Sequence, residues 1–374
     1  MNGYNMNPLS SPKQLSIALI NAYPLYTGST AAVLDYYRAL KDLGYSVVLY
    51  QLVIPGTSFK YPEPAIHIRG RNFFVDAVNL PMNVLFTMPG ETPNIEADII
   101  ILTDPVILTL KVKFPDSIVI FHDLREFGTF SQNPARKLFF IYLARFLRDN
   151  DKVIASSNFT KEMIQLHIKR DLNIRVVELC SSIGINQVQF QDKLAKHQAN
   201  PKNVSVLYIA ADRPYKNIKL FIKVAQLIDK MNLDIDYNFR LVSKLRRSNR
   251  KALMKEKPSN LVVIEHVDEL DLLYREADVL LFPSKVEGFG LPLAEAMSYG
   301  VPIIYSSRPP MTDIVGNFGI AVDPETPELW VRELLGLSAF GTYEKMARLS
   351  YERSKNYSYE RFKANVSRAL KSFF

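Results

Sequence analysis

Short apolar runs alternate with helical patterns along the first half of the chain. Residues 15–20 predict a buried strand, residues 31–43 have the spacing of an amphipathic helix that ends at Gly44, and residues 47–50 form the next apolar run. This order is a βαβ opening, which is typical of a doubly wound parallel sheet. The same patterns predict further strands at 99–102, 118–121 and 153–155, and helices at 134–148 and 160–167.

The same rhythm restarts after a polar segment at 187–203, which we interpret as a linker. Strands are then predicted at 204–210, 239–242, 262–265, around Val279 and at 301–305, with helices at 217–231 and 268–276. A chain of 374 residues exceeds one ordinary hydrophobic core. We therefore expect two α/β domains, residues 1–190 and 191–356, that face each other across a cleft.

Composition and charge narrow the class of protein. The formal net charge is +8, spread over both halves, and 48% of the residues are hydrophobic, as expected for a folded protein with a generally basic surface. Such a surface suits an anionic small molecule or an anionic membrane, and no nucleic-acid motif is present. Cys180 is the single cysteine, the first 14 residues lack the apolar core of a signal peptide, and no run reaches the ~18 apolar residues of a spanning helix. We expect a cytoplasmic protein that is soluble or peripheral to a membrane.

Residues 284–297 are the most informative segment. They follow the predicted strand at 277–283 and place Glu287 in a turn with two glycines, before Glu295 on an apolar helix. A turn that opens a helix aims N–H groups and the positive end of the helix dipole at a bound anion, and phosphate is the natural guest. Two carboxylates beside a phosphate suit sugar or ribose hydroxyls. The alternative for Glu295 alone is a solvated carboxylate on a packed helix.

This segment resembles the Glu-x7-Glu motif of retaining glycosyltransferases of family 4, which have the GT-B fold of two Rossmann-like domains. Glu287 and Glu295 stand at its two Glu positions. The resemblance implies that Glu287 contacts hydroxyls of the transferred sugar and that Glu295 holds the nucleotide ribose. The intervening residues that match its glycine turn and continuation are donor-binding candidates, namely Gly288, Phe289, Gly290 and Leu291.

The resemblance extends over most of the chain. Residues 267–278 resemble the helix before the main motif, and Val267 at their start is a further donor-binding candidate. Residues 316–324 resemble the Gly-x-x-x-x-Pro exit loop of the family. The end of the chain, from about residue 357 to 374, resembles a last helix that crosses back onto the N-terminal domain.

A pair of cations follows the first predicted strand of the second half. Arg213 and Lys216 stand at a turn into a helix, where Arg can bind phosphate bidentately and Lys adds a point charge. The resemblance implies that they hold the donor diphosphate, whose charge grows as it leaves. The alternative is two surface cations at a helix start, although positive charge is unfavourable there.

Two candidates lie in the first half. His122 and Asp123 end the strand at 118–121, on the edge that faces the cleft in such sheets. The resemblance places His122 near the donor sugar, while Asp123 orients His122 or its loop. Gly28 lies in the first strand-to-helix turn, where relatives often have two glycines that approach phosphate or acceptor, and the neighbouring hydroxyls of Ser29 or Thr30 equally suit a helix cap.

The chain also departs from the family pattern. Ser243 and Lys244 replace glycines that relatives often carry near the nucleotide base, and residues 182–184 read Ser-Ile-Gly where relatives have Asn-Gly. Asp234 and Asp236 look like a metal motif of another glycosyltransferase fold. We discount them because the cations and the helix end already serve the phosphate, and we expect no essential metal and no cofactor.

Residues 136–148 combine basic and large apolar side chains. They predict either a core helix with charged ends or a helix that lies on an anionic membrane and presents a lipid-linked acceptor.

These patterns together predict a retaining glycosyltransferase. Its donor is a nucleoside-diphosphate sugar of the UDP or GDP type, it transfers a hexose-type sugar, and its acceptor is an unidentified hydroxyl on a glycan, lipid or small molecule. Two alternatives stay open: a glycoside hydrolase that uses Glu287 and Glu295 as its carboxylate pair, and a sugar-nucleotide-binding protein without transferase activity.

Overall fold

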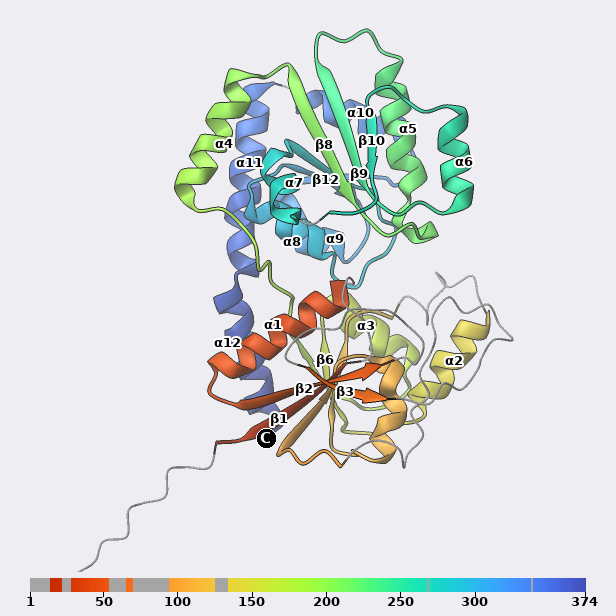
Figure 1. The fold of residues 1–374 in the computed structure, drawn as a ribbon, viewed down its shortest axis with the longest axis vertical. Helices are drawn as coiled ribbons and strands as arrows, with labels where there is room; N and C mark the ends of the chain where they lie inside the picture. The colour runs from red at the N-terminus through yellow and green to blue at the C-terminus, as the bar shows by residue number, and fades with distance from the viewer. Residues whose placement is uncertain are drawn as a thin grey trace, which may run out of the picture.

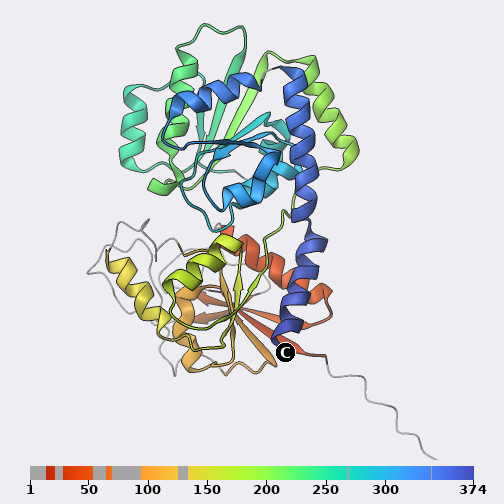
Figure 2. The same ribbon diagram turned by 180° about the vertical axis from the view of Figure 1, so that it is seen from behind.

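The computed structural model describes residues 14–21, 28–53, 65–69, 94–124, 134–267, 269–337 and 339–374. Within these residues, two parallel sheets with flanking helices lie one above the other, and the last helices run along one side of both (Figure 1). Figure 2 shows the same arrangement from behind. The predicted architecture of two Rossmann-like α/β domains is confirmed.

The first sheet is built from strands in the order β3-β2-β1-β4-β5-β6-β7, all parallel. Its strands are nearly continuous apolar runs, because helices cover a parallel sheet on both faces. They are β1 (Ser16–Asn21), β2 (Ser46–Val53), β3 (Ala65–Arg69), β4 (Ile99–Leu102), β5 (Ile118–Phe121), β6 (Lys152–Ala155) and β7 (Asn173–Val176). The accompanying helices are α1 (Gly28–Asp42), η2 (Pro105–Val112), α2 (Pro134–Ala144) and α3 (Asn158–His167).

The second sheet has the order β10-β9-β8-β11-β12-β13 and is also parallel. Its strands are β8 (Asn203–Ile209), β9 (Asp236–Val242), β10 (Leu261–Ile264), β11 (Val279–Phe282), β12 (Ile303–Ser306) and β13 (Ile320–Val322). Its helices are α4 (Gln187–Ala199), η3 (Pro214–Lys216), α5 (Ile218–Asp229), α6 (Arg247–Lys255), α7 (Leu270–Glu276), α8 (Leu291–Ser298), α9 (Met311–Val315), η4 (Gly316–Phe318) and α10 (Pro327–Gly336).

The chain ends in helices that cross from the second sheet back to the first (Figure 1; Figure 2). They are α11 (Phe340–Ser354), η5 (Lys355–Tyr357) and α12 (Tyr359–Phe373). The Phe362 ring of α12 packs edge-on against Tyr36 of α1, with centroids 4.9 Å apart. The Tyr359 hydroxyl donates to the Asp42 carboxylate at 2.6 Å. The last helix therefore packs on α1 and joins the two halves of the molecule.

Several predicted boundaries were wrong. The segment at 187–203 is mostly the helix α4, whose N-terminus has a capping box between Asn186 and Gln189. The division into residues 1–190 and 191–356 stays a prediction, and α4 spans the residues on both sides of it. α4 escaped the pattern because it is polar, with three buried residues. The predicted loop at 316–324 contains η4 and β13, and α2 ends at Ala144 rather than at residue 148.

The order of the strands sets where a ligand can lie. Each sheet reverses its winding beside its first strand, between β1 and β4 in the first sheet and between β8 and β11 in the second. Doubly wound sheets bind ligands in the crevice at the carboxyl ends of such strands. The loops that follow β8 and β11 carry Arg213, Lys216 and Glu287, so the fold brings these sequence-distant residues to one crevice.

Candidate functional site

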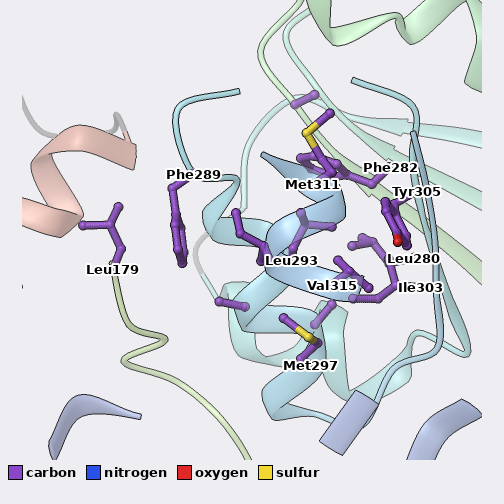
Figure 3. Packing of buried hydrophobic residues seen from close by; sticks show 14 of the residues in the cluster. Leu179, Leu280, Phe282, Phe289, Leu293, Met297, Ile303, Tyr305, Met311 and Val315 are labelled. Carbon is purple, nitrogen blue, oxygen red and sulfur yellow. The ribbon is translucent and has the colours of Figure 1, made fainter. Parts of the chain in front are cut away.

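The turn between β11 and α8 forms the centre of the site. Glu287, Gly288, Phe289 and Gly290 are all buried in this turn, and Glu295 lies on α8, as the motif predicted. Gly290 caps α8 with φ 94°, a left-handed conformation that favours glycine. The buried face of α8 packs through Leu293 and Met297 into the core of the second domain (Figure 3).

Gly288 is the point where the two domains meet. A Cβ atom at this position would lie 1.9 Å from the His122 carbonyl oxygen and 2.6 Å from the Asp123 Cβ. The Gly288 carbonyl accepts hydrogen bonds from the Ser157 hydroxyl at 2.6 Å and the Thr160 hydroxyl at 3.1 Å. The absence of a side chain at 288 therefore allows the carboxyl ends of the two sheets to touch.

Lys216 and Glu287 form a buried ion pair. The ammonium of Lys216 lies 2.6 Å from Glu287 Oε1 and 2.8 Å from Oε2, and the side chains are only 15% and 6% exposed. The Tyr208 hydroxyl donates to the Lys216 carbonyl and also meets the Ser284 hydroxyl at 3.0 Å. β8 and the turn after β11 thus fix the ammonium and the carboxylate together.

Arg213 supplies the uncompensated positive charge of the site. Its side chain is partly exposed and makes no hydrogen bond or ion pair within the described residues. The residue before it, Asp212, is buried and accepts from the Arg246 N–H at 2.7 Å and from the Asn249 amide at 2.8 Å. The Lys216–Glu287 pair is neutral, so Arg213 is the cation of this loop that has no ion-pair partner among the described residues.

Glu295 lies in a different environment from Glu287. Its Oε2 accepts a hydrogen bond of 2.6 Å from the Tyr274 hydroxyl on α7. Burial raises the pKa of Glu295 to about 7, the hydrogen bond from Tyr274 opposes that rise, and the Asp35 carboxylate on α1 adds to it. The two carboxylates of the motif therefore have separate partners and separate electrostatics.

His122 is buried, and its backbone carbonyl lies at the contact with Gly288 of the second domain. Burial lowers its pKa to about 4, and the opposing effects of the Asp123 carboxylate and the Thr103 backbone do not reverse this. The ring is therefore neutral at pH 7. Neither ring nitrogen has a hydrogen-bond partner at good geometry within the described part of the chain. Buried polar atoms are nearly always bonded, so these two nitrogens are exceptions among the described residues.

The remaining predicted residues have more limited roles. The Phe289 ring is buried and packs edge-on against Tyr357 at 5.5 Å, so it belongs to the core; the same ring faces Leu179 in Figure 3. Leu291 is the first residue of α8 and is partly exposed, and Val267 follows β10. Gly28 begins α1, directly after residues 22–27, which lie outside the described part of the chain.

The discounted metal-like pair, Asp234 and Asp236, lies at the amino end of β9. Asp236 begins β9 and Asp234 precedes it, whereas the site lies at the carboxyl ends of the strands. Both side chains are exposed. Within the described residues no three His, Cys, Asp or Glu side chains gather as a metal site would require. A cavity of about 620 Å³ between α4, β8 and α7 contains none of the predicted site residues.

Sequence reasoning missed the buried residues that contact the candidate site residues. Tyr208 and Tyr274 are both fully buried, and their hydroxyls contact Lys216 and Glu295. Asp35 on α1 is a buried carboxylate that accepts from the Ser182 hydroxyl at 2.5 Å. A charged residue among the buried positions of α1 was the one available signal, while a tyrosine in an apolar pattern looks like ordinary core.

Comparison with known proteins defines the class. The structure resembles sucrose-phosphate synthase from Thermosynechococcus elongatus with a TM-score of 0.76 at 15% identity, covering 96% of this chain and 99% of the other. It resembles Anabaena HepE in complex with UDP and glucose with a TM-score of 0.72 at 13% identity, covering 96% and 100%. These likenesses and the two parallel sheets identify the GT-B fold.

The amino-acid sequence matches a family model over part of the chain. Residues 189–354 match the family model of glycosyl transferases group 1. The O-antigen chain mannosyltransferase RfbU of Salmonella typhimurium is 26% identical over 79% of this chain and 76% of its own length. O-antigen chain mannosyltransferase B of Escherichia coli is 29% identical over 56% of this chain and 57% of its own length. The chain therefore has the GT-B fold, and its second half is similar to glycosyl transferases group 1.

Proposed function

We propose that this protein is a retaining glycosyltransferase that moves a hexose-type sugar from a nucleoside-diphosphate sugar to a hydroxyl acceptor without an essential metal. The observation that carries the proposal is the buried Lys216–Glu287 pair, on the turn where Gly288 adjoins the backbone carbonyl of His122. The loops after β8 and β11 thus combine a carboxylate, an ammonium and the guanidinium of Arg213, and the backbone of His122 adjoins them. These groups match the hydroxyls and the diphosphate of a nucleotide sugar.

The charges assign the parts of the donor. Arg213 and Lys216 lie on the loop after β8 and face the diphosphate, together with the N–H groups at the start of α8. Glu287 accepts hydrogen bonds from sugar hydroxyls, and the neutral ring of His122 offers one N–H and one acceptor nitrogen to the same sugar. Glu295 accepts from the ribose.

The reaction follows from this placement. The acceptor oxygen forms a bond to the anomeric carbon on the face from which the diphosphate departs. The bond between the anomeric carbon and the phosphate oxygen breaks, its electron pair stays with the diphosphate, and the acceptor proton passes to a leaving phosphate oxygen. Arg213 and Lys216 stabilise the negative charge that grows on the diphosphate in the transition state, as fixed cations are expected to do.

The hydrolase alternative is less compatible with the site. A retaining hydrolase needs two carboxyl groups ~5–5.5 Å apart on one glycosidic bond, one of them a proton donor. Glu287 is occupied by Lys216, and Glu295 bonds Tyr274 from α7. Two carboxylates that are anchored to different elements serve two parts of one donor better than one bond.

The relatives narrow the first donors to test. Two are named mannosyltransferases, and the HepE neighbour holds UDP and glucose. We propose a hexose donor and would test the GDP- and UDP-linked forms of mannose, glucose and galactose, with and without EDTA. Release of nucleoside diphosphate by the wild type, with EDTA present and at least about 100-fold faster than by Arg213→Ala, supports the proposal. Tight donor binding without any release supports a binding protein.

We also propose that α2 faces an anionic membrane that carries the acceptor. On α2 itself, Phe140 and Leu143 are buried, whereas Leu138 is 67% exposed. Ile141 and Tyr142 are exposed as well. Lys137 is exposed as well. An apolar stripe flanked by cations is the pattern of a helix that lies in a membrane interface. In the described part of the chain, no helix has the length and apolar character needed to cross a bilayer.

The helix α6 adds positive charge on the same side of the molecule as α2 (Figure 1; Figure 2). Residues 244–257 contain seven Lys and Arg and one Glu, a net of 7 − 1 = +6 within a chain of net +8. The positive charge is therefore more concentrated than the sequence analysis suggested. Arg250 is paired with Glu265. Met254, an apolar residue of the same helix, is 75% exposed between basic residues. This face suits anionic lipid, and a cytoplasmic location remains our prediction.

A further inference from the structure

Tyr274 links the helix α4 to Glu295, the second carboxylate of the motif. It lies on α7, is fully buried, and stacks on the Tyr299 ring with centroids 5.6 Å apart. Its hydroxyl donates to Glu295 Oε2 at 2.6 Å. Its carbonyl accepts from the Lys193 ammonium of α4 at 2.8 Å. The residue is thus held at its backbone, its ring and its hydroxyl.

The surroundings of Glu295, apart from Tyr274, disfavour its ionised form. Burial and the Asp35 carboxylate of α1 both disfavour the ionised form of Glu295, and the Tyr299 hydroxyl lies near enough to be influenced by it. Within the described residues no cation forms an ion pair with Glu295, in contrast to Glu287, which pairs with Lys216. The Tyr274 hydroxyl is the one named contact that favours the charged carboxylate.

We propose that Tyr274 is a positioning residue for the nucleotide ribose: its hydroxyl holds Glu295 ionised and turned so that Oε1 accepts a ribose hydroxyl. The inference rests on the proposed function, because it takes Glu295 to be the ribose acceptor. A carboxylate that already accepts one fixed bond at Oε2 has its plane set, so a ribose hydroxyl meets Oε1 at little further ordering cost. A proton on Glu295 would remove part of this acceptor capacity.

The chain contains a matched control. Tyr343 is as buried as Tyr274 and also stacks on a neighbouring ring, that of His197. Its hydroxyl has no hydrogen-bond partner in the described residues. Tyr343→Phe therefore removes a buried hydroxyl without touching a carboxylate, whereas Tyr274→Phe removes the bond to Glu295 and keeps the ring.

The test is calorimetric binding of a nucleoside diphosphate and of its 2′,3′-dideoxy form to five proteins: wild type, Tyr274→Phe, Tyr343→Phe, Glu295→Gln, and Glu295→Gln combined with Tyr274→Phe. UDP and GDP are both tried, and the base that binds the wild type is used throughout. Hydrogen bonds to a charged group contribute ~1.5–3 kcal/mol, so Tyr274→Phe should weaken ribonucleotide binding by at least about 10-fold. The dideoxy probe should bind wild type and Tyr274→Phe within about 2-fold of each other, because it lacks the hydroxyls through which Glu295 acts. Tyr343→Phe should behave as wild type with both probes.

The pH profile provides a second readout. Glu295 has a pKa raised to about 7, so ribonucleotide affinity of the wild type should fall as the pH drops through that value and the carboxylate takes a proton. Loss of the Tyr274 bond raises the pKa of Glu295 further. The fall should then move to higher pH in Tyr274→Phe and stay in place in Tyr343→Phe.

The outcomes separate this inference from the function on which it rests. Equal weakening of both probes by Tyr274→Phe, with an unmoved pH profile, would mean that the tyrosine only supports the fold and would overturn the inference. In the Glu295→Gln protein, ribose preference should be lost and Tyr274→Phe should add nothing. If Glu295→Gln loses the preference and Tyr274→Phe keeps it, the inference alone fails. If wild type has no ribose preference, the assignment of Glu295 fails and the inference fails with it.

Discussion

Removal of the charge on Lys216 should cost both stability and activity, by separable amounts. Lys216→Met keeps the apolar stem and leaves Glu287, which is 6% exposed, without its counterion. Breaking a buried ion pair costs ~3–5 kcal/mol, and because Lys216 retains 15% exposure we take about 3 kcal/mol. For a domain of this size, ~2–4 °C of melting temperature corresponds to each kcal/mol, which gives a loss of ~6–12 °C.

Two further variants complete the measurement by scanning calorimetry. Lys285→Met is the matched control, on the turn that carries Glu287, because its pair with Glu325 is 2.8 Å long but the two side chains are 32% and 52% exposed. An exposed pair contributes ~0–1 kcal/mol, so this control should melt within ~0–4 °C of wild type. Lys216→Met with Glu287→Gln removes both charges and should recover most of the lost stability, because no unpaired buried charge is left.

Turnover should follow a different pattern from stability. Lys216→Met should lower kcat by ~10²–10³, the usual effect of losing one contact to a developing anion, and the double variant should stay inactive. Lys216→Met that melts with the wild type would refute the buried pair. Restored turnover in the double variant would mean that Lys216 matters only as a counterion and would refute its role at the diphosphate.

Three other perturbations test separate parts of the account. Gly288→Ala places a Cβ against the backbone of the first domain, so we expect turnover to fall at least about 10-fold while nucleoside diphosphate binding persists. The control is Gly336→Ala, whose new Cβ meets no atom within 4 Å. Equal losses of turnover in both variants would contradict the contact at Gly288. Arg213→Ala should lower kcat more than nucleoside affinity, and near-normal kcat would remove it from the diphosphate site. Lys137→Gln with Arg145→Gln should reduce sedimentation with anionic vesicles at low salt, because screening over ~10 Å near 0.1 M salt already weakens such attraction; wild type that never binds vesicles would refute the membrane face.

The sequence predicted the elements whose pattern is set by burial. The strands at 99–102 and 118–121 match β4 and β5 to the residue, because both are short apolar runs in the middle of a covered sheet. The helices α4 and α6 were missed because both lie on the surface with few buried positions. β3 was missed as well, since it lies at the edge of its sheet.

The site divides in the same way. The motif placed Glu287 in a turn and Glu295 on a helix, because a local pattern of glycines and apolar residues encodes a strand, a turn and a helix. The pairing of Lys216 with Glu287 depends on β8 lying next to β11, more than 70 residues further along the chain. Contacts of that kind come from strand order. The bond from Tyr274 to Glu295 likewise joins two helices whose packing no single pattern encodes.

The most direct test of the central claim is proton NMR of the wild type with the nucleotide sugar that it turns over best, followed from the first minutes of reaction. The account predicts release of nucleoside diphosphate with a product whose anomeric configuration matches that of the donor, at a rate that EDTA does not change and that Lys216→Met nearly abolishes. A product of inverted configuration would contradict the same-face displacement. Turnover that persists in Lys216→Met would contradict the assignment of the reaction to this crevice.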